Sequence, residues 1–222
     1  MIKIENVDVY GWEAAIRGAR NPMNSWDKSD SNCDWVPEYP PRIGPNDHKL
    51  LSNLANAGPD HGKFLRMITV YMDITAPLYW WKEFDTYKVG TVANSCSTMH
   101  KIHAKEFTLE DFSYEHLSED DYMFGDGEYD YELAYTYKQF LENTIMVLNV
   151  AREQYLKTND KKFWWQMIQL LPTSYNQRRT VLLNYQVLKS MYHARKNHKL
   201  DDWRNFCEFV KTLPYSELIT NE

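Results

Sequence analysis

The residues in this sequence best suited to hold an anion are arginines of its C-terminal third. Arg178 follows the run Leu171–Gln177, and Arg195 and Arg204 lie further along the chain. A guanidinium group offers several N–H donors in one plane, which suits a phosphate or a carboxylate. Surface arginines are also commonly solvated or paired with acids. The sequence therefore leaves two interpretations open, an anion site and a set of surface ion pairs.

A second candidate for ligand binding is the segment Gly90–Thr98, which is almost free of bulky side chains. The backbone amides and hydroxyl groups of such a stretch can approach an anionic ligand closely. The other interpretation is a polar connection that caps the next helix. We predict a loop here, and the sequence does not decide between the two roles.

One group of possible metal ligands is formed by Cys96, His100 and His103. Their spacing fits no common zinc site and no fourth ligand is apparent, so we predict no metal centre. The Gly125–Gly127 turn lies in an acidic segment but lacks the residue order of a calcium loop. Nothing in the sequence supports Cys96 as a nucleophile.

The length and the charge distribution limit the class of protein. No Pro-, Gly- or Ser-rich linker divides the 222 residues, so we expect a single domain over residues 1–222. Eleven of the 31 acids lie between Glu106 and Glu132, where there is no Lys or Arg, which leaves 20 acids against 25 bases elsewhere. This balance suits a phosphorylated small ligand better than a nucleic acid polymer, because no Lys/Arg run marks a polymer-binding stripe.

The cellular setting is indicated by the cysteines and by the N-terminus. Cys33, Cys96 and Cys207 are far apart and lack CxxC spacing, which favours a reducing compartment. No signal-peptide pattern opens the chain, and no apolar run reaches the ~18 residues of a membrane helix. We expect a soluble, cytosolic protein. Its aromatic content of 15% exceeds what a minimal core requires, which suits either ring-binding sites or the ordinary half-buried packing of Tyr and Trp.

The elements that must position these groups begin with a strand from Ile2 to Val9 and a helix from Trp12 to Arg20. Residues 21–47 are rich in Pro, Asp and Ser, as is typical of a long ordered surface loop. A helix is predicted from Asn46 to Ala57, because its leucines share one face and Gly58 can end it. The β-branched and aromatic run from Phe64 to Thr75 predicts a strand.

The second half of the chain is predicted to be mainly helical. A helix that starts at Pro77 should end near Gly90, because apolar residues recur there at helical spacing. The acidic stretch from Thr108 to Asp130 predicts loops with a short helix. Further helices are expected in four segments: Leu133–Leu156, Phe163–Leu170, Ser174–Arg195 and Asp201–Thr212.

The order of these elements resembles that of the flavin-dependent thymidylate synthases. That family has a helix with a small-residue turn, a strand, a helix ending in the signature R-H-R-x-x-S, and later the motifs LP…YTR…N and LR…HAQWEIR. The resemblance covers most of residues 9–206. The matching positions are Leu50–Gly58, Phe64–Arg66, Trp80–Lys88, Thr91, Asn94, Ser97, Leu171–Pro172, Tyr175, Arg178, Asn184, Arg195, Trp203 and Arg204.

The resemblance implies an α+β fold, with an antiparallel sheet flanked by long helices. It also implies a homotetramer that holds FAD and a pyrimidine nucleotide such as dUMP between its subunits. In that family a methylene group passes from methylenetetrahydrofolate to C5 of dUMP, and reduced flavin, recharged by NADPH, supplies the hydride. No cysteine nucleophile is required, because positioning and electrostatics activate C5.

The resemblance also assigns roles by position. Arg204 would be catalytic and polarise the uracil ring, while Arg178 would bind the nucleotide phosphate. Glu83, Ser95 and Ser97 would contact the nucleotide. The residues along FAD would be Arg66, Lys88, Arg195 and Lys199.

The family signature itself is altered in this chain. Its R-H-R falls on Thr86, Tyr87 and Lys88, its glutamate on Ser95 and its last arginine on Met99. Lysine keeps a positive charge but does not bind phosphate in a bidentate manner. Two functions therefore remain: an FAD-dependent C5 methyltransferase acting on a pyrimidine nucleotide, and a catalytically inactive nucleotide-binding or assembly protein that retains the fold.

Overall fold

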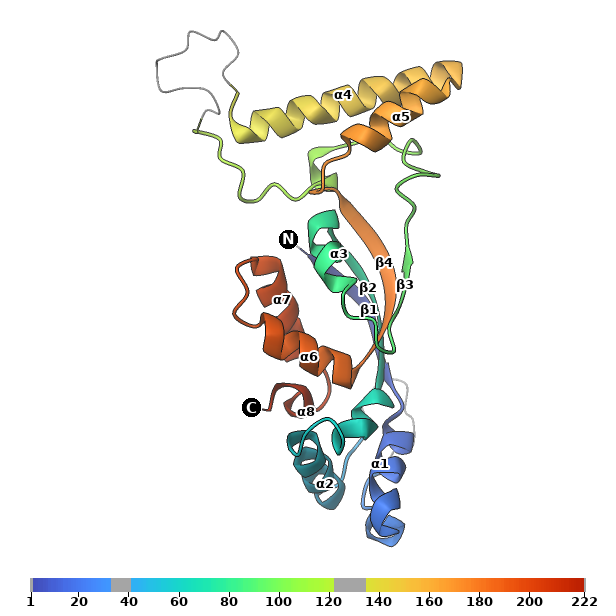
Figure 1. Ribbon diagram of the computed structural model, residues 1–222, viewed down its shortest axis with the longest axis vertical. Coiled ribbons are helices and arrows are strands. Elements are labelled where there is room, and N and C mark those ends of the chain that lie inside the picture. Colours follow the sequence, from blue (N-terminus) through green and yellow to red (C-terminus); the bar gives the residue numbers. More distant parts are fainter. Residues whose placement is uncertain (1, 33–40, 122–134, 222) are drawn as a thin grey trace. The chain divides into compact units, whose positions relative to one another are not determined.

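A computed structural model describes residues 2–32, 41–121 and 135–221. An antiparallel sheet of four strands runs through the chain in the order β1-β2-β4-β3 (Figure 1). The strands are β1 (Lys3–Tyr10), β2 (Thr69–Pro77), β3 (Val92–Ser95) and β4 (Asn176–Asn184). β1 pairs with β2 from Lys3 opposite Thr75 to Tyr10 opposite Thr69, with a bulge between Glu5 and Asp8.

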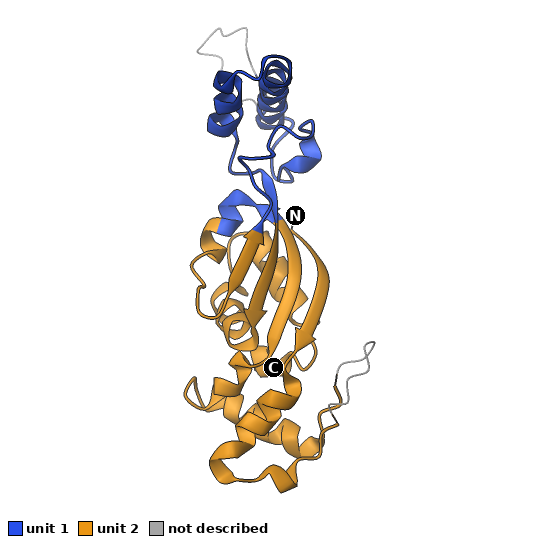
Figure 2. Ribbon diagram, turned by 90° about the vertical axis from the view of Figure 1, so that its right-hand side faces the viewer, with its two compact units in different colours: residues 1, 76–81, 95–178 blue, residues 2–75, 82–94, 179–222 orange. Residues whose placement is uncertain are grey.

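The chain divides into two compact units (Figure 2). Unit 1 comprises residues 1, 76–81 and 95–178, and unit 2 comprises residues 2–75, 82–94 and 179–222. The boundaries fall inside β2, β3 and β4 and inside the helix α3 (Leu78–Phe84). The expectation of a single domain over residues 1–222 stays a prediction.

Unit 2 is built on one covered face of the sheet. Along β2, Val70, Met72 and Ile74 are buried and alternate with more exposed neighbours, as the pleat of a half-buried strand requires. Two helices, α6 (Tyr185–Arg195) and α7 (Asp201–Val210), lie over this face in Figure 1. The other elements are α1 (Trp12–Arg20), η1 (Asn21–Met23), η2 (Trp26–Lys28), α2 (Pro45–Asn56), η3 (Gly62–Arg66) and α8 (Glu217–Thr220).

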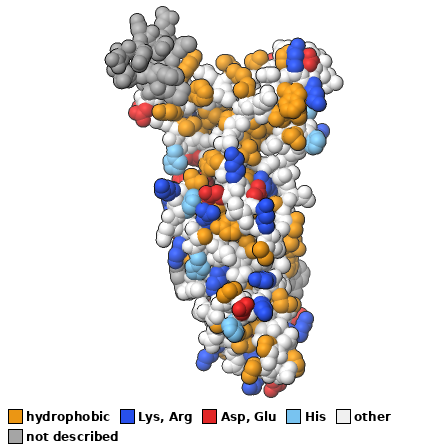
Figure 3. All heavy atoms as spheres, in the orientation of Figure 1, with side chains coloured by type: hydrophobic (Ala, Val, Ile, Leu, Met, Phe, Trp, Pro, Cys, Tyr) orange, Lys and Arg blue, Asp and Glu red, His pale blue; other side chains and the backbone are white. Residues whose placement is uncertain are grey.

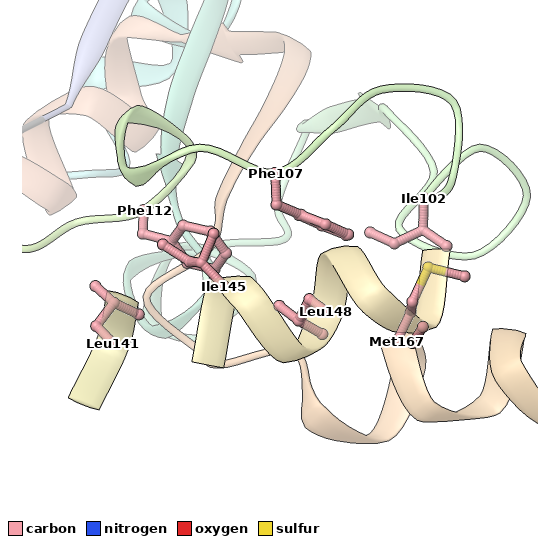
Figure 4. Close-up of a cluster of buried hydrophobic side chains, with 8 residues drawn as sticks. Ile102, Phe107, Phe112, Leu141, Ile145, Leu148 and Met167 are labelled. Atoms are coloured by element: carbon pink, nitrogen blue, oxygen red, sulfur yellow. The ribbon is translucent and has the colours of Figure 1, made fainter. Parts of the chain in front are cut away.

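Unit 1 has its own hydrophobic core. The long helix α4 (Tyr137–Thr158) packs against α5 (Lys161–Leu170). A short helical turn, η4 (Leu109–Asp111), precedes α4 in the chain. Thr136 and Gln139 cap the start of α4 reciprocally, and Asn159 ends it in the left-handed conformation. Figure 4 shows the core side chains Ile102, Phe107, Phe112, Leu141, Ile145, Leu148 and Met167.

Most of the predicted elements are confirmed, but four differ. The strand expected at Phe64 begins only at Thr69, because residues 62–66 form η3. Pro77 ends β2 rather than starting a helix, and α3 stops at Phe84, where Thr86 and Tyr87 form turn hydrogen bonds to Glu83 and Phe84. Thr86, Tyr87 and Lys88 therefore lie beyond the helix.

The other two differences concern strands that were not predicted. The segment expected as a loop contains β3, because its backbone pairs with β4. The first half of the helix expected over residues 174–195 is β4, and α6 begins only at Tyr185, where the Asn184 side chain accepts a hydrogen bond from the Val187 amide. Cys33, Leu133 and the Gly125–Gly127 turn lie outside the described residues.

The surface shows no large region of one charge on the face drawn in Figure 3, where basic and acidic side chains are interspersed. In the part of the chain that the structure describes, no helix is long and apolar enough to cross a membrane. The cytosolic location stays a prediction.

Candidate functional site

The carboxylate of Glu83, near the end of α3, is the centre of a polar cluster in unit 2. Its Oε2 accepts a hydrogen bond of 2.6 Å from the Trp203 indole N–H. The same oxygen lies 3.2 Å from a terminal nitrogen of Arg195, with which Glu83 forms an ion pair. Glu83 therefore joins the end of α3 to the end of α6 and the start of α7. A carboxylate that accepts charged and neutral donors together holds both in fixed positions.

Arg195 is held from a second side by Tyr87. Its Nε–H donates to the Tyr87 hydroxyl over 3.0 Å, and its guanidinium carbon lies 5.1 Å from the centre of the Trp203 ring. This cation–π contact adds to the ion pair because Trp203 is fully buried. Since a guanidinium group has no acceptor, the hydroxyl hydrogen of Tyr87 must point elsewhere. The Tyr87 hydroxyl can therefore donate a hydrogen bond to a group other than Arg195.

His198 completes the cluster, and its tautomer follows from its neighbours. The backbone N–H of Leu200 donates to His198 Nδ1 over 3.2 Å, so in the neutral ring the proton is on Nε2. Nε2 lies 3.6 Å from Oε2 of Glu83. His198 therefore presents an N–H to the carboxylate without having to be charged.

The segment from Tyr87 to Gly90 runs along α6. Tyr87 contacts Arg195 at the end of this helix. At its start, the side-chain nitrogen Nδ2 of Asn184 lies 3.5 Å from the Val89 carbonyl oxygen and 3.4 Å from the Gly90 carbonyl oxygen. Gly90 has a φ of +71°, and a Cβ atom there would lie 2.8 Å from that nitrogen. Glycine is favoured here because other residues rarely adopt this backbone conformation and because a Cβ atom would force the Asn184 side chain to shift.

The residues assigned to FAD are distributed around α6. Tyr185 at its start donates its amide to the Ile68 carbonyl, two residues after Arg66. Arg195 ends the helix, which is about 15 Å long at 1.5 Å per residue. Lys88 follows Tyr87, and Lys199 lies in the turn between α6 and α7.

The charges of these residues are suited to phosphate groups. Within the described residues, the side chains of Arg66, Lys88 and Lys199 are exposed and make no ion pair, whereas Arg195 is compensated by Glu83. Three uncompensated cations spread along a helix of this length fit an extended ligand that carries several negative charges. The donor set is therefore compatible with a phosphate-bearing cofactor such as FAD.

Arg204, predicted to be catalytic, helps to fix the turn between α6 and α7. One of its terminal nitrogens donates to the carbonyl oxygens of His198 and Lys199, over 2.7 and 2.9 Å. The side chain is otherwise exposed. These two bonds hold Arg204 in position beside the Glu83 cluster through His198.

The predicted nucleotide residues Ser95, Ser97 and Arg178 lie in unit 1. The Cys96 amide donates to the Arg178 carbonyl over 2.9 Å, so Cys96 and Arg178 are neighbours across β3 and β4. Because side chains alternate along a strand, Ser95 points to the face opposite to Arg178. The Ser97 hydroxyl accepts the amides of Met99 and His100 and so stabilises a local turn.

The structure therefore brings Glu83, Arg195, Lys199 and Arg204 together within unit 2, but it does not bring Ser95 and Arg178 to one face. Sequence reasoning missed His198, Trp203 and Tyr87 as members of the cluster. The available signal was their place in the chain, since two of the three lie in the short stretch between Arg195 and Arg204. Among the residues described, no group of three or more His, Cys, Asp or Glu side chains could hold a metal ion.

Comparison with known proteins extends the resemblance to the whole chain. No protein-family model and no curated protein sequence matches this sequence. Among solved structures, thymidylate synthase X (ThyX) from Helicobacter pylori with FAD and dUMP aligns with a TM-score of 0.68 and 15% identity, over 100% of this chain and 98% of that one. A second structure of the H. pylori enzyme with FAD and dUMP gives 0.66 at 15% identity and covers 98% of both chains.

A solved protein of a different description has the same fold. The UMP/dUMP methylase PolB from Streptomyces cacaoi, bound to 5-Br dUMP, aligns with a TM-score of 0.62 and 17% identity, over 100% of this chain and 95% of that one. The predicted α+β fold with its antiparallel sheet is therefore confirmed, and so is the resemblance to flavin-dependent thymidylate synthases at the level of the fold.

Proposed function

We propose that this protein methylates C5 of a pyrimidine nucleotide, converting dUMP to dTMP or acting on a related nucleotide. The observation that carries the proposal is the alignment over the entire chain with ThyX, solved with FAD and dUMP, and with a UMP/dUMP methylase. Fold alone does not establish function, so the residues of the site must also suit the chemistry.

The cofactor in the proposal is FAD, with NADPH and methylenetetrahydrofolate as co-substrates. Arg66, Lys88, Arg195 and Lys199 would hold FAD, because three of them are exposed cations without an ion pair in the described structure. Reduced flavin would supply the hydride that completes the methyl group. The hydroxyl of Tyr87 would donate a hydrogen bond to the same ligand, since Arg195 occupies its acceptor side.

The nucleotide would be held by Arg178 at its phosphate, with Glu83, Ser95 and Ser97 as further contacts. Arg204 would direct its guanidinium group at the negative charge that develops on the pyrimidine ring. Its two carbonyl contacts favour this role, because they fix the group before the ligand binds and so reduce the ordering needed in the transition state.

The proposal includes a homotetramer. The helix α4 exposes six large apolar side chains, each at least 46% exposed: Tyr137, Phe140, Met146, Val147, Val150 and Leu156. Exposed apolar side chains on one helix favour a subunit contact. A second subunit would also supply nucleotide contacts that one chain offers on opposite faces of its sheet.

The alternative is a catalytically inactive protein that binds a nucleotide or serves in assembly. Two observations favour it: Thr86 and Tyr87 replace the first two residues of the family signature, and Glu83 neutralises Arg195, one of the proposed cofactor contacts. Under this alternative Arg178 would still bind a phosphate.

Ligand binding separates the two functions. Purified protein is incubated with FAD and passed through an ultrafiltration membrane, and dUMP and UMP binding is measured by calorimetry for the wild type and Arg178→Ala. The proposal predicts retained flavin absorption and a nucleotide affinity about tenfold or more lower in the variant, because a charged hydrogen bond is lost. Nucleotide binding without retained flavin would support the inactive protein, and equal affinities would remove Arg178 from the site.

A further inference from the structure

A cavity of about 450 Å³ lies in unit 2 between α1 and the loop that follows it. One wall is a face of α1 formed by Glu13, Ile16, Arg17 and Arg20, which recur at helical spacing. Trp26 and Ser31 lie on the loop side. The volume is within the range of small-molecule sites, and none of the predicted site residues lines the cavity. Figure 1 shows α1 beside α2, away from α7 within the same unit.

The loop from residue 21 to 32 is fixed almost entirely by polar contacts. Its two short helical turns, η1 and η2, bury no side chain, so hydrophobic burial does not hold it. Instead, the buried guanidinium group of Arg20 donates to Asp47 Oδ1 over 2.6 Å and to the carbonyls of Ser25 and Lys28 over 3.1 and 3.0 Å. The loop adds no side chain to the core, yet a buried ion pair anchors it. We therefore look for its role in the surface that it presents to the cavity.

The second oxygen of Asp47 holds the far end of the loop. It accepts hydrogen bonds from the hydroxyls of Ser29 and Ser31, over 2.8 and 2.6 Å, and from the backbone amides of Asp30 and Ser31, each over 3.0 Å. Asp30 in turn accepts the first amides of α2. The cavity wall is therefore preformed, and a ligand would lose little free energy in ordering it.

Two features of the lining point to the class of ligand. Trp26 is 50% exposed, and its indole N–H donates to Asn21 Oδ1 over 2.8 Å, which fixes the plane of the ring. A fixed and half-exposed indole provides a stacking surface for another planar ring. On α1, Arg17 donates from one nitrogen to one oxygen of Glu13 over 3.0 Å.

The Glu13–Arg17 pair faces solvent, with 74% and 63% of the two side chains exposed, so water takes its remaining hydrogen-bonding groups in the free protein. No described residue takes the second oxygen of Glu13 or the remaining N–H groups of Arg17. An acceptor therefore stands beside a donor on one wall of the cavity. A lactam edge, a ring N–H next to a ring C=O, presents the complementary pair, with the N–H facing the carboxylate and the C=O facing the guanidinium group.

We propose that this cavity binds a planar heterocycle through its lactam edge, with the ring stacked on Trp26. Guanine, uracil and pterin rings share this edge, and the test distinguishes them. The site is separate from the Glu83 cluster, so the inference does not rest on the proposed C5 chemistry.

The test follows the indole N–H resonance of Trp26 in the ¹⁵N-labelled full chain, assigned by its loss in Trp26→Phe. Guanosine, uridine and pterin are titrated separately, each nucleoside against its counterpart methylated on the lactam nitrogen. We expect a saturable shift with at least one probe, and an affinity about two- to fivefold lower after methylation or in Glu13→Gln, since each removes a charged hydrogen bond that solvent partly screens. Glu153→Gln, which alters an exposed i,i+4 pair on α4, should leave the affinity unchanged.

The outcomes decide the inference. The probe that shifts Trp26 identifies which of the three rings the site prefers. Absence of any shift with all three probes at millimolar concentration would exclude the site. Equal binding of the methylated nucleosides, or unchanged affinity in Glu13→Gln, would reduce the contact to stacking and overturn the lactam assignment.

Discussion

Replacement of Glu83 by Gln tests whether the polar cluster around α6 is held by its charge. The change keeps the shape and one acceptor for Trp203 but removes the ion pair with Arg195, whose atoms are 3.2 Å apart. A hydrogen bond to a charged group contributes about 1.5–3 kcal/mol. Because the Glu83 side chain is 37% exposed, solvent screening reduces this, and we expect a loss of about 1–2 kcal/mol.

For a chain of this length, that loss lowers the melting temperature by about 2–8 °C. The matched control is Asp85→Asn, which breaks the ion pair with Arg179 at the same end of α3, where the acid is 50% exposed. The control should cost less than about 1 kcal/mol. A double-mutant cycle of Glu83→Gln with Arg195→Gln should show a coupling free energy near 1 kcal/mol at low salt that falls as salt is added.

The reasoning fails if the coupling is indistinguishable from zero, or if Glu83→Gln is no less stable than Asp85→Asn. A normal stability combined with loss of nucleotide affinity would instead make Glu83 a ligand contact only.

Three further predictions concern other parts of the chain. Burial alone would raise the pKa of Asp47, but hydrogen bonds from Ser31, Ser29 and Arg20 outweigh it and lower the pKa to about 2. Because the pKa of Asp47 is lower in the folded state than the unfolded value of about 3.9, the ionised carboxylate stabilises the fold at higher pH. About 2–3 kcal/mol of the free energy of unfolding should therefore be lost as the pH falls from about 5 towards 2. Asp47→Asn should abolish this acid dependence in denaturant titrations. Burial raises the pKa of the Cys207 thiol to about 11, so iodoacetamide at pH 8 should label exposed Cys96 much faster than Cys207 in the native protein, as followed by mass spectrometry; equal rates would contradict the burial. Gly90→Ala should destabilise the protein by about 1–2 kcal/mol in thermal unfolding, because of its positive φ and the close approach of Asn184, and an unchanged melting temperature would refute that contact.

Local sequence signals were sufficient for elements that are defined by their own residues. The helix Trp12–Arg20 was predicted with the bounds that it has, and the helix Asn46–Ala57 differs from α2 by one residue at each end. Both have short-range signals, a following Asn-Pro or Gly and apolar residues on one face. Such signals do not depend on the rest of the chain.

The strand β4 could not be predicted in the same way. In the segment Asn176–Asn184, Val181 and Leu183 are buried while Leu182 between them is only half-buried, yet three consecutive apolar residues also fit a helix. Pairing with β2 and β3 decides the conformation, and these partners are distant in sequence. The same dependence explains β3, whose polar residues resemble a loop.

The sequence indicated which charged residues to consider for the candidate site, but not which side chains pair with one another. Arg66, Lys88 and Arg195 were assigned to FAD from their order in the chain, and this assignment stays a prediction. The pairing of Glu83 with Arg195, Trp203 and His198 joins residues more than a hundred positions apart, and no local pattern encodes it. This pairing changes the expected role of Glu83, since one of its oxygens is already occupied.

The proposed chemistry is tested most directly by tritium release from dUMP or UMP labelled at C5, with FAD, NADPH and methylenetetrahydrofolate supplied. The wild type should release tritium, Arg204→Lys should reduce turnover by about a hundredfold while weakening binding less, and Cys96→Ser should leave turnover nearly unchanged. Activity that survives in Arg204→Lys but is lost in Cys96→Ser would reverse the assigned mechanism. Absence of release by the wild type from both nucleotides would contradict C5 methylation of either and leave the inactive nucleotide-binding protein.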